Sequence, residues 1–236
     1  MKPYTKIYLP TTLIRVILSF FMYGVGIIVL GASIFPGVTF LYYLWIHTAA
    51  VAIPLRLLYF CFGFVFGYFL SGAMLMTVVS FIRIVFQLQL KEGEYAGDSF
   101  EIFKWLFINA FFLAVKVAFM DFILLTPYCS LFYRLMGAKI GRNVEINTKN
   151  VMDLSLLEIG NNVIIGGNAT VICHSFERKG LKLKKVRIGN NVIIGLNAVV
   201  FPGVVIGDNA VIAAGTIIPK DTHVAANTTY FGTAIK

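Results

Sequence analysis

The chain has few charged residues and few cysteines, and each shortage excludes a class of protein. Only 13% of its 236 residues are charged, whereas 58% are hydrophobic. A soluble domain has about 25% charged and about 45–50% apolar residues, so neither a disordered chain nor an ordinary soluble globule fits this composition. The three cysteines, Cys61, Cys129 and Cys173, are odd in number and lack CxxC spacing. Neither a disulfide framework nor a cysteine metal centre is predicted.

Charge is missing altogether from two long stretches near the N-terminus. Val16–Leu55 is a run of forty residues without Asp, Glu, Lys or Arg, and Leu57–Ile82 is a run of twenty-six. A bilayer crossing needs about 20 apolar residues, so these runs predict at least two membrane spans. The segment Trp105–Thr126 contains Lys116 and Asp121, and it could cross the membrane, enter and return, or lie in the interface. Two to four spans are therefore expected.

The turn between the first two spans is expected near residues 31–38, where Gly31 and Pro36-Gly37 interrupt the apolar run. The net charge of +9 arises from nine basic and five acidic residues in 1–138 and eleven and six in 139–236. Neither part is basic enough to indicate nucleic-acid binding, and a positive balance beside apolar segments fits an anionic membrane surface. We expect a helical transmembrane or interfacial domain over 1–138 and a second domain over 139–236.

The second domain contains a sequence repeat with a period of six. Glycine follows several of the repeated aliphatic residues, and asparagine recurs between them. A strict six fits neither the 3.6-residue period of a helix nor the alternation of a strand. Hexapeptide repeats are typical of a parallel β-helix, in which three hexads form one coil, so roughly five coils are expected. The repeated aliphatic residues are Ile188, Ile194, Val200, Ile206, Ile212, Ile218 and Val224.

One segment breaks this period and is expected to loop out from the coils. Val171 and Ile188 are seventeen residues apart, which is not a multiple of six, and the segment between them contains His174 and Glu177. Loops on a rigid scaffold often carry function. The uneven charge of this segment favours an anionic partner: the phosphates of coenzyme A, an acidic carrier protein or lipid head groups. Its basic residues are Arg178, Lys179, Lys182, Lys184, Lys185 and Arg187.

The stretch Ile188–Asp221 resembles the terminal coils of the hexapeptide-repeat acyltransferases. The resemblance implies a left-handed parallel β-helix, assembly as a homotrimer and a coenzyme A thioester as the acyl donor. It also implies that coenzyme A lies against the turn Ala213-Ala214-Gly215, hence against Ala214 and Gly215, and against Lys220. The oxyanion that forms during transfer would be met by a backbone N–H near Gly195.

A second resemblance covers most of the chain and is to the membrane-bound terminal region of ε-poly-lysine-synthetase-type peptide synthetases. It implies that the apolar segments and the β-helix form one unit. The donor would then be an aminoacyl group on carrier-bound phosphopantetheine, and an acyl or peptidyl carrier protein would be a partner. The motifs that carry it are Lys91–Tyr95, Lys104-Trp105, Arg134–Gly141, Asp153-Leu154, Glu158–Gly160, His174–Arg178 and Phe231–Ala234.

Acyl transfer from a thioester needs a base that takes the proton of the attacking hydroxyl or amine, and histidine suits this work near neutral pH. His174 is the candidate base because it lies in the segment that interrupts the repeat. Coils stack at about 4.8 Å, so Asp153 is expected close beneath His174. The resemblance implies that Asp153 orients the base or binds the acceptor. Glu177 is a second candidate for that role. Cys173 is expected to point inward as a small apolar residue.

These patterns together predict an N-terminal α-helical membrane domain followed by a left-handed parallel β-helix of hexapeptide repeats. The predicted activity is acyl or aminoacyl transfer to a hydroxyl or amine at the membrane, in a multi-pass plasma-membrane protein whose β-helix faces the cytoplasm. A non-catalytic trimeric membrane scaffold is one alternative. Another is a zinc hydratase of the carbonic anhydrase type, which needs about three His ligands where the repeat part has only His174 and His223. No metal is expected.

Overall fold

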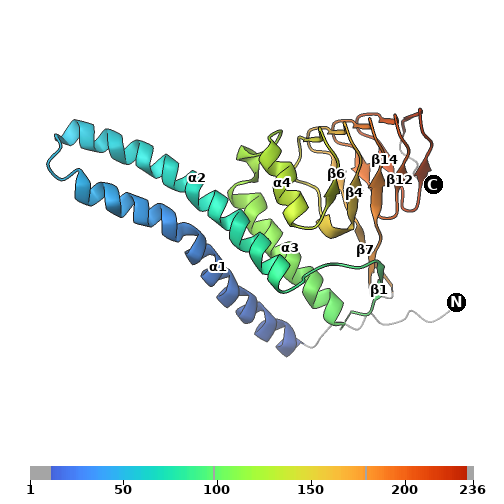
Figure 1. Ribbon diagram of the computed structural model, residues 1–236. Coiled ribbons are helices and arrows are strands. Elements are labelled where there is room, and N and C mark those ends of the chain that lie inside the picture. The colour runs from blue at the N-terminus through green and yellow to red at the C-terminus, as the bar shows by residue number, and fades with distance from the viewer. Residues whose placement is uncertain (1–11, 98, 179, 233–236) are drawn as a thin grey trace.

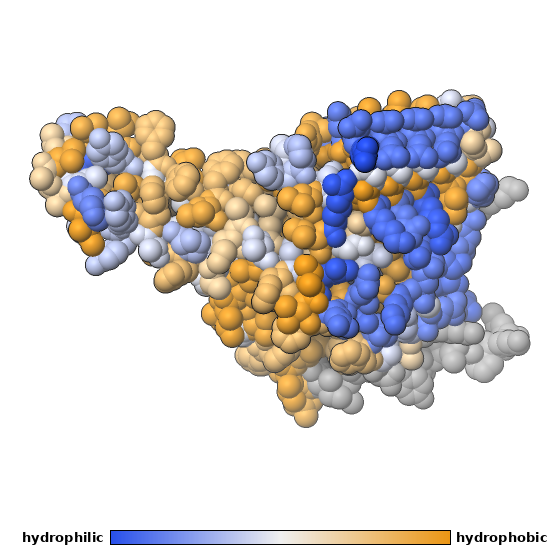
Figure 2. Space-filling model, in the orientation of Figure 1, coloured by the Kyte–Doolittle hydropathy of each residue, from blue (hydrophilic) through white to orange (hydrophobic). Residues whose placement is uncertain are grey.

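A computed structural model describes residues 12–97, 99–178 and 180–232 of the chain. Two long helices, α1 (Thr12–His47) and α2 (Ile53–Val85), form a hairpin that projects from the rest of the molecule (Figure 1). Both helices are long and apolar enough to cross a membrane, over Val16–His47 and Ile53–Val85. The surface of the helical part is largely hydrophobic, whereas the part built from strands is largely hydrophilic on the side that Figure 2 shows.

The turn expected near residues 31–38 is wrong, because α1 continues through Pro36 and the chain reverses between His47 and Ile53. Gly37 instead marks the point where the two helices cross. A Cβ atom on Gly37 would lie 2.6 Å from the carbonyl oxygen of Gly67, so the helices approach more closely there than any larger residue permits. Small residues at a helix crossing are typical of membrane helix pairs, and such helices tolerate proline.

Shorter helices connect the hairpin to the strands. They are α3 (Phe100–Ala118), the single turn η1 (Met120–Phe122) and α4 (Pro127–Leu135). One side of α3 is buried through Ile102, Trp105, Ile108, Phe111, Phe112 and Val115. A third span over 105–126 was one expectation. Among the described residues, however, α3 is not one of the helices that are long and apolar enough to cross a membrane. It lies against the protein instead.

Helix α4 packs against the first coil of the β-helix. The hydroxyl of Ser130 donates to the carbonyl oxygen of Val144, and the guanidinium of Arg134 donates to that of Ile140. Tyr133 is completely buried, and the hydrophobic core is continuous from the helices into the coils. The helix therefore covers an end of the coil stack that would otherwise expose its apolar interior.

The rest of the described chain forms a parallel β-helix with three faces, as predicted from the repeat. The first face has the strand order β15-β12-β9-β4-β2, the second β16-β13-β10-β5-β3 and the third β14-β11-β6. The strands are β2 (Lys139–Ile140), β3 (Glu145–Ile146), β4 (Leu157–Ile159), β5 (Ile164–Ile165), β6 (Thr170–Val171), β9 (Val186–Ile188), β10 (Ile193–Ile194), β11 (Val199–Val200), β12 (Val205–Ile206), β13 (Val211–Ile212), β14 (Ile217–Ile218), β15 (His223–Val224) and β16 (Thr229–Tyr230).

The inward aliphatic residues of the hexads stack in register from coil to coil. Ile165, Ile194 and Ile212 are paired neighbours along the second face, and all three are fully buried. The predicted fold class, apolar helices followed by a repeated parallel β-helix, is confirmed. Its period of six arises because each hexad supplies one short strand and one corner of a coil.

Asparagine is required at one corner of the coils, between the first and second faces. Five asparagines there have φ between 52° and 58°, a left-handed conformation that asparagine tolerates better than most residues. Their side-chain amides form a ladder in which each Nδ2 donates to the Oδ1 of the asparagine one coil further on. They are Asn143, Asn162, Asn191, Asn209 and Asn227.

The segment that breaks the repeat forms an antiparallel hairpin, β7 (His174–Glu177) and β8 (Gly180–Leu183), that stands off a corner of the coils. Its second strand also pairs with β1 (Gly93–Tyr95), which comes from the connection between α2 and α3 (Figure 1). Gly180 has φ of 131°, and a Cβ atom there would lie 2.1 Å from the carbonyl oxygen of Tyr95. Only glycine lets the two strands approach so closely.

Replacing Asn191 tests the asparagine ladder. Asn191→Ala removes two amide hydrogen bonds and places a less tolerant residue at φ 56°, so we expect a loss of about 1–2 kcal/mol and a fall in Tm of about 2–6 °C. Asn191→Gly keeps the backbone conformation accessible and should lose less. Thermal unfolding followed by circular dichroism measures both variants, and an unchanged Tm in Asn191→Ala would contradict the ladder's contribution.

Candidate active site

His174 and Asp153 lie together at the corner between the third and first faces. We call this the hairpin corner; it comprises residues 152–153, 172–185, 201–203 and 219–221. Nδ1 of His174 is 2.6 Å from Oδ2 of Asp153. The carboxylate accepts hydrogen bonds only, so Nδ1 carries the proton in the neutral imidazole and Nε2 keeps a free lone pair. The pair has the geometry of an oriented general base.

Asp153 is held by more than its contact with His174. Its side chain is fully buried, and its backbone has φ of 56°, in the left-handed region. Oδ2 also accepts the backbone N–H of Cys173 at 3.1 Å, and Oδ1 accepts the indole N–H of Trp105 at 2.8 Å. Three N–H donors therefore surround a carboxylate that water does not reach, as a buried charge requires.

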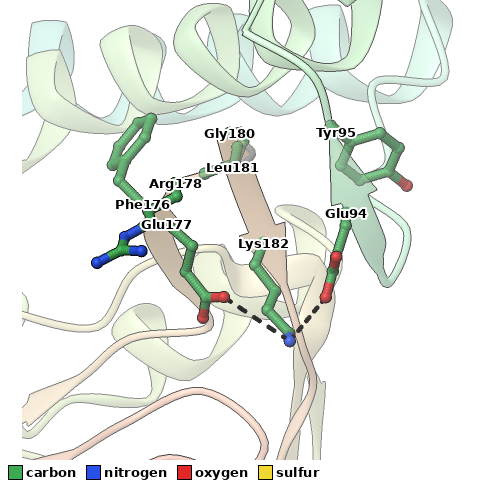
Figure 3. Close-up of a pocket in the computed structure, with 8 residues that line it drawn as sticks. All are labelled: Glu94, Tyr95, Phe176, Glu177, Arg178, Gly180, Leu181 and Lys182. Atoms are coloured by element: carbon green, nitrogen blue, oxygen red, sulfur yellow. Dashed lines mark ion pairs between the residues drawn. The ribbon is translucent and has the colours of Figure 1, made fainter. Parts of the chain in front are cut away.

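The small sheet β1-β8-β7 has one apolar face and one polar face. Side chains alternate along each strand, so His174 and Phe176 share a face with Leu181, whereas Glu177 and Lys182 lie on the other. In Figure 3, Phe176 points toward the helices, and Glu177 and Lys182 point away from them. The apolar face meets α3 at Trp105, whose ring centre is 4.9 Å from that of His174 and 5.5 Å from that of Phe176. His174 thus faces the helical part of the molecule.

Glu177 is not brought to His174, because the two side chains lie on opposite faces of the sheet. Its carboxylate is 3.2 Å from Nζ of Lys220 and 3.9 Å from Nζ of Lys182. The hydrogen bond from Lys220 holds the pKa of Glu177 below its usual value, and the positive charge of Lys182 acts in the same direction. Glu177 therefore binds lysines in this structure rather than the imidazole.

Four basic residues of the segment that interrupts the repeat are paired with acids outside that segment. Lys182 binds Glu94 of β1 at 2.7 Å, and this contact raises the pKa of the lysine. The remaining pairs are Lys184 with Asp221, and Lys185 and Arg187 with Glu158. The carboxylates of these acids offset the positive charge of the basic segment 178–187. Lys179 lies outside the described residues, as do Thr233 and Ala234.

A groove of about 590 Å³ lies along this corner, lined mainly by charged residues of 92–94 and 182–187, together with Gly203 and Asp221. A second cavity of about 730 Å³ lies at the hairpin and is lined by residues of β1, β7 and β8 (Figure 3). Its wall combines the apolar side chains of Tyr95, Phe176 and Leu181 with Glu94, Glu177 and Lys182. Glu94 and Lys182 line both of these spaces.

Gly195, Ala214 and Gly215 lie at a different corner, between the second and third faces. We call it the glycine corner; it comprises residues 166–168, 195–197 and 213–215. Ala214 and Gly215 are exposed, and the space where a side chain of Gly215 would stand is open. The N–H of Gly195 donates to the carbonyl oxygen of Ile212 at 2.8 Å, so it is engaged between coils and not directed at a ligand. Lys220, by contrast, is at the hairpin corner.

Cys173 points into the core, although it adjoins the candidate base. It is fully buried, and burial together with the nearby negative charge of Asp153 raises the pKa of its thiol well above the usual value. Burial likewise raises the pKa of Cys129 to about 12. Neither thiol is a nucleophile in this structure, since the thiolate is the reactive form.

Two contributions to the site were not identified from the sequence: the indole of Trp105 and the strand β1. A tryptophan N–H inside an apolar helix needs an acceptor when buried, so Trp105 could have been paired with a buried carboxylate in principle. Nothing local indicates that the acceptor is Asp153, forty-eight residues away. In the described parts of the chain, no group of three or more His, Cys, Asp and Glu is arranged to hold a metal ion.

Comparison with known proteins gives one family match and several similar structures. The family model "hexapeptide repeat of succinyl-transferase" matches residues 185–220. No curated protein matches the chain. The structures that the chain resembles include acetyltransferases of the hexapeptide-repeat type.

A hexapeptide-repeat acetyltransferase from Vibrio cholerae is 27% identical over 42% of this chain and 60% of its own length, with a TM-score of 0.38. A maltose O-acetyltransferase from Clostridium difficile 630 is 22% identical over 59% and 88%, with a TM-score of 0.43. A galactoside acetyltransferase in complex with coenzyme A is 28% identical over 43% and 64%, with a TM-score of 0.36. The match thus spans about three fifths of the Vibrio enzyme.

Alkylation tests the state of the buried thiols. In a Cys61→Ser variant, which removes the exposed thiol, we expect Cys129 and Cys173 to resist a water-soluble maleimide at about pH 8 while the protein is folded. Unfolding in detergent should release both thiols, which mass spectrometry counts. Rapid addition of one label to the folded variant would contradict the inward position of these side chains.

Proposed function

We propose that the protein is an acyltransferase that moves an acyl or aminoacyl group from a coenzyme A or pantetheine thioester to a hydroxyl or amine at a membrane. The observation that carries the proposal is the hydrogen bond between His174 and the buried Asp153, at the corner where the hexapeptide repeat is interrupted. The match of residues 185–220 to the succinyl-transferase repeat supports the same activity.

His174 acts as the general base in this proposal. Asp153 keeps the proton on Nδ1, so Nε2 accepts the proton of the acceptor's hydroxyl or amine as that atom attacks the thioester carbonyl. A new carbon–oxygen or carbon–nitrogen bond forms, the carbon–sulfur bond breaks, and the departing thiolate takes the proton back from Nε2. Asp153 stays ionised and stabilises the imidazolium that forms between the two proton transfers.

The apolar helices support an acceptor that lies at the membrane. His174 sits on the sheet face turned toward α3, and α3 contacts the α1–α2 hairpin through Phe107 and Phe21. The hairpin turn carries Arg56 as its nearby cation, whereas Arg83, Lys91 and Lys104 lie at the other end. By the positive-inside rule, this distribution supports a cytoplasmic location for that end and for the β-helix, with the plasma membrane crossed twice by α1 and α2 in this proposal.

The donor and the base would meet between neighbouring copies of a homotrimer. Ala214 and Gly215 are small and exposed, which leaves space for a pantetheine arm. They lie at the glycine corner, however, away from His174. A second copy whose glycine corner faces the hairpin corner of the first would bring the two together. Exposed apolar side chains on the second face and at the glycine corner, Ile164, Ile193 and Leu196, support contact between copies.

The thioester itself has two possible carriers. Acyl-coenzyme A agrees with the hexapeptide-repeat match, whereas an aminoacyl group on a carrier protein agrees with the resemblance to peptide synthetases. The paired lysines at the hairpin corner would have to exchange their carboxylate partners for phosphate in either case. Isothermal titration with acetyl-coenzyme A, and separately with an acyl-pantetheine, distinguishes the two donors by whether the nucleotide part contributes to binding.

Substitution of the base tests the proposed reaction. His174→Gln should retain the fold and lose transfer by about 10²- to 10⁴-fold, because the attacking group keeps its proton. Transfer is measured as radiolabel passed from acetyl-coenzyme A to membranes of the expression host. His223→Gln, at an exposed position on β15, is the matched control and should transfer at the wild-type rate. A wild-type rate in His174→Gln would remove this residue from the mechanism.

Substitution on the second face tests the trimer. Ile193→Glu combined with Leu196→Glu places two charges on the apolar contact, so we expect the assembly to dissociate into single chains in detergent. Light scattering after size exclusion measures the mass, and activity should fall with it. His223→Glu, on the first face, should leave the mass unchanged. A double variant that keeps the wild-type mass would contradict contact through these residues.

A further inference from the structure

Trp105 is the one helical residue whose side chain donates a hydrogen bond to the carboxylate of the candidate base pair, among the contacts of the described residues. Its Nε1–H donates to Oδ1 of Asp153 at 2.8 Å, while Oδ2 of the same carboxylate contacts Nδ1 of His174. The indole is 8% exposed and Asp153 is 3% exposed, so water does not replace this bond. The three groups form a continuous chain from α3 to the imidazole.

We propose that Trp105 is a positioning residue, which sets the orientation and the tautomer of His174 through Asp153. This inference rests on the proposed function, in which His174 is the base. A carboxylate with two oxygens can rotate about its Cβ–Cγ bond, and each donor that it binds removes part of that freedom. The backbone N–H of Cys173 fixes Oδ2, and Trp105 fixes Oδ1, so both oxygens are held.

The indole also restrains the imidazole directly. The rings of Trp105 and His174 are 4.9 Å apart and inclined at 66°, which is an edge-to-face contact. Phe176 lies beside Trp105, with its ring centre 6.3 Å from that of His174 and 5.5 Å from that of Trp105. His174 therefore has a carboxylate at Nδ1 and two aromatic rings beside it, and Nε2 is the ring nitrogen left for the acceptor.

The rest of α3 ties this arrangement to the membrane helices. Lys116 donates to Oδ1 of Asn150 at 2.9 Å, three residues before Asp153. Phe107 of α3 lies 5.9 Å from Phe21 of α1, and Phe119, just beyond the helix, occupies the space beside Gly72 of α2. Helix α3 and the residue just beyond it thus contact both candidate spans, and α3 also binds the carboxylate of Asp153. Its docking is part of the site.

The test separates the hydrogen bond of Trp105 from its bulk. Trp105→Phe keeps an aromatic ring against His174 and Phe176 but removes the N–H donor. We expect kcat to fall by about tenfold to a hundredfold with little change in KM for acetyl-coenzyme A, as is typical when a group that orients a functional side chain is lost. Phe112→Leu, another buried position on α3 without a contact to Asp153, is the matched control for loss of packing.

A spectroscopic measurement in the same variants does not depend on activity. The chain has three histidines, so nitrogen-15 labelling of histidine gives three imidazoles, and His174→Gln assigns the relevant one. In the wild type and in Phe112→Leu, we expect His174 to hold its proton on Nδ1. In Trp105→Phe, we expect a mixture of the Nδ1–H and Nε2–H forms. A wild-type tautomer in Trp105→Phe would overturn the inference.

A double-substitution cycle completes the test. If Trp105 acts through Asp153, then adding Trp105→Phe to Asp153→Asn should lower kcat no further, whereas independent effects would multiply and overturn the inference. A mixed tautomer in Trp105→Phe supports the positioning role whether or not transfer is detected. Absence of transfer in the wild-type protein would count against the proposed function alone, so the two failures are distinguishable.

Discussion

The pairing of each coil with the next determines where everything else in this molecule can lie. Backbone N–H groups of one coil donate to carbonyl oxygens of its neighbour, as Gly195 does to Ile212, and the inward aliphatic residues stack in the same register. An insertion cannot enter this ladder without unpairing a coil, so it must leave at a corner. The hairpin β7–β8 does so at the corner directly above Asp153. The distance between His174 and the carboxylate of Asp153 is therefore set by the spacing of the coils, and not by the hairpin.

The helices form part of the structure of the β-helix domain. Helix α4 covers the first coil with Tyr133 and Ser130, and the core runs without interruption from the helices into the coils. Helix α3 contributes the indole N–H of Trp105 to the buried carboxylate of Asp153, in addition to the backbone N–H of Cys173. The other N–H groups of the coils are largely used between coils. Part of the apolar helical region therefore belongs to the candidate site.

The features that could be predicted from the sequence are those with a local or periodic cause. The hexads repeat every six residues, so the parallel β-helix and the protruding segment at 171–188 could be read directly, and coil stacking placed Asp153 near His174. The features that could not be predicted depend on partners far along the chain. Trp105 and β1 come from the helical part of the chain. The acids that pair with the lysines are Glu94, Glu158 and Asp221, from β1, β4 and the residues before β15. Pro36-Gly37 indicated a turn because such a pair ends most helices, yet it lies where two apolar helices cross.

The pairing of β1 with β8 has a consequence for how the protein folds. Gly93 and Leu183 are neighbours in space but ninety residues apart in sequence, and the contact must wait until the chain between them is synthesised. Closing so long a loop is slow compared with forming a helix or adding one coil to another. The α1–α2 hairpin and the coils can each form from local contacts, whereas the sheet that carries His174 can form only when both are in place. Pairing of β1 with the hairpin that carries His174 thus comes last, and a chain that has not reached that point has its helices and coils without the third strand of this sheet.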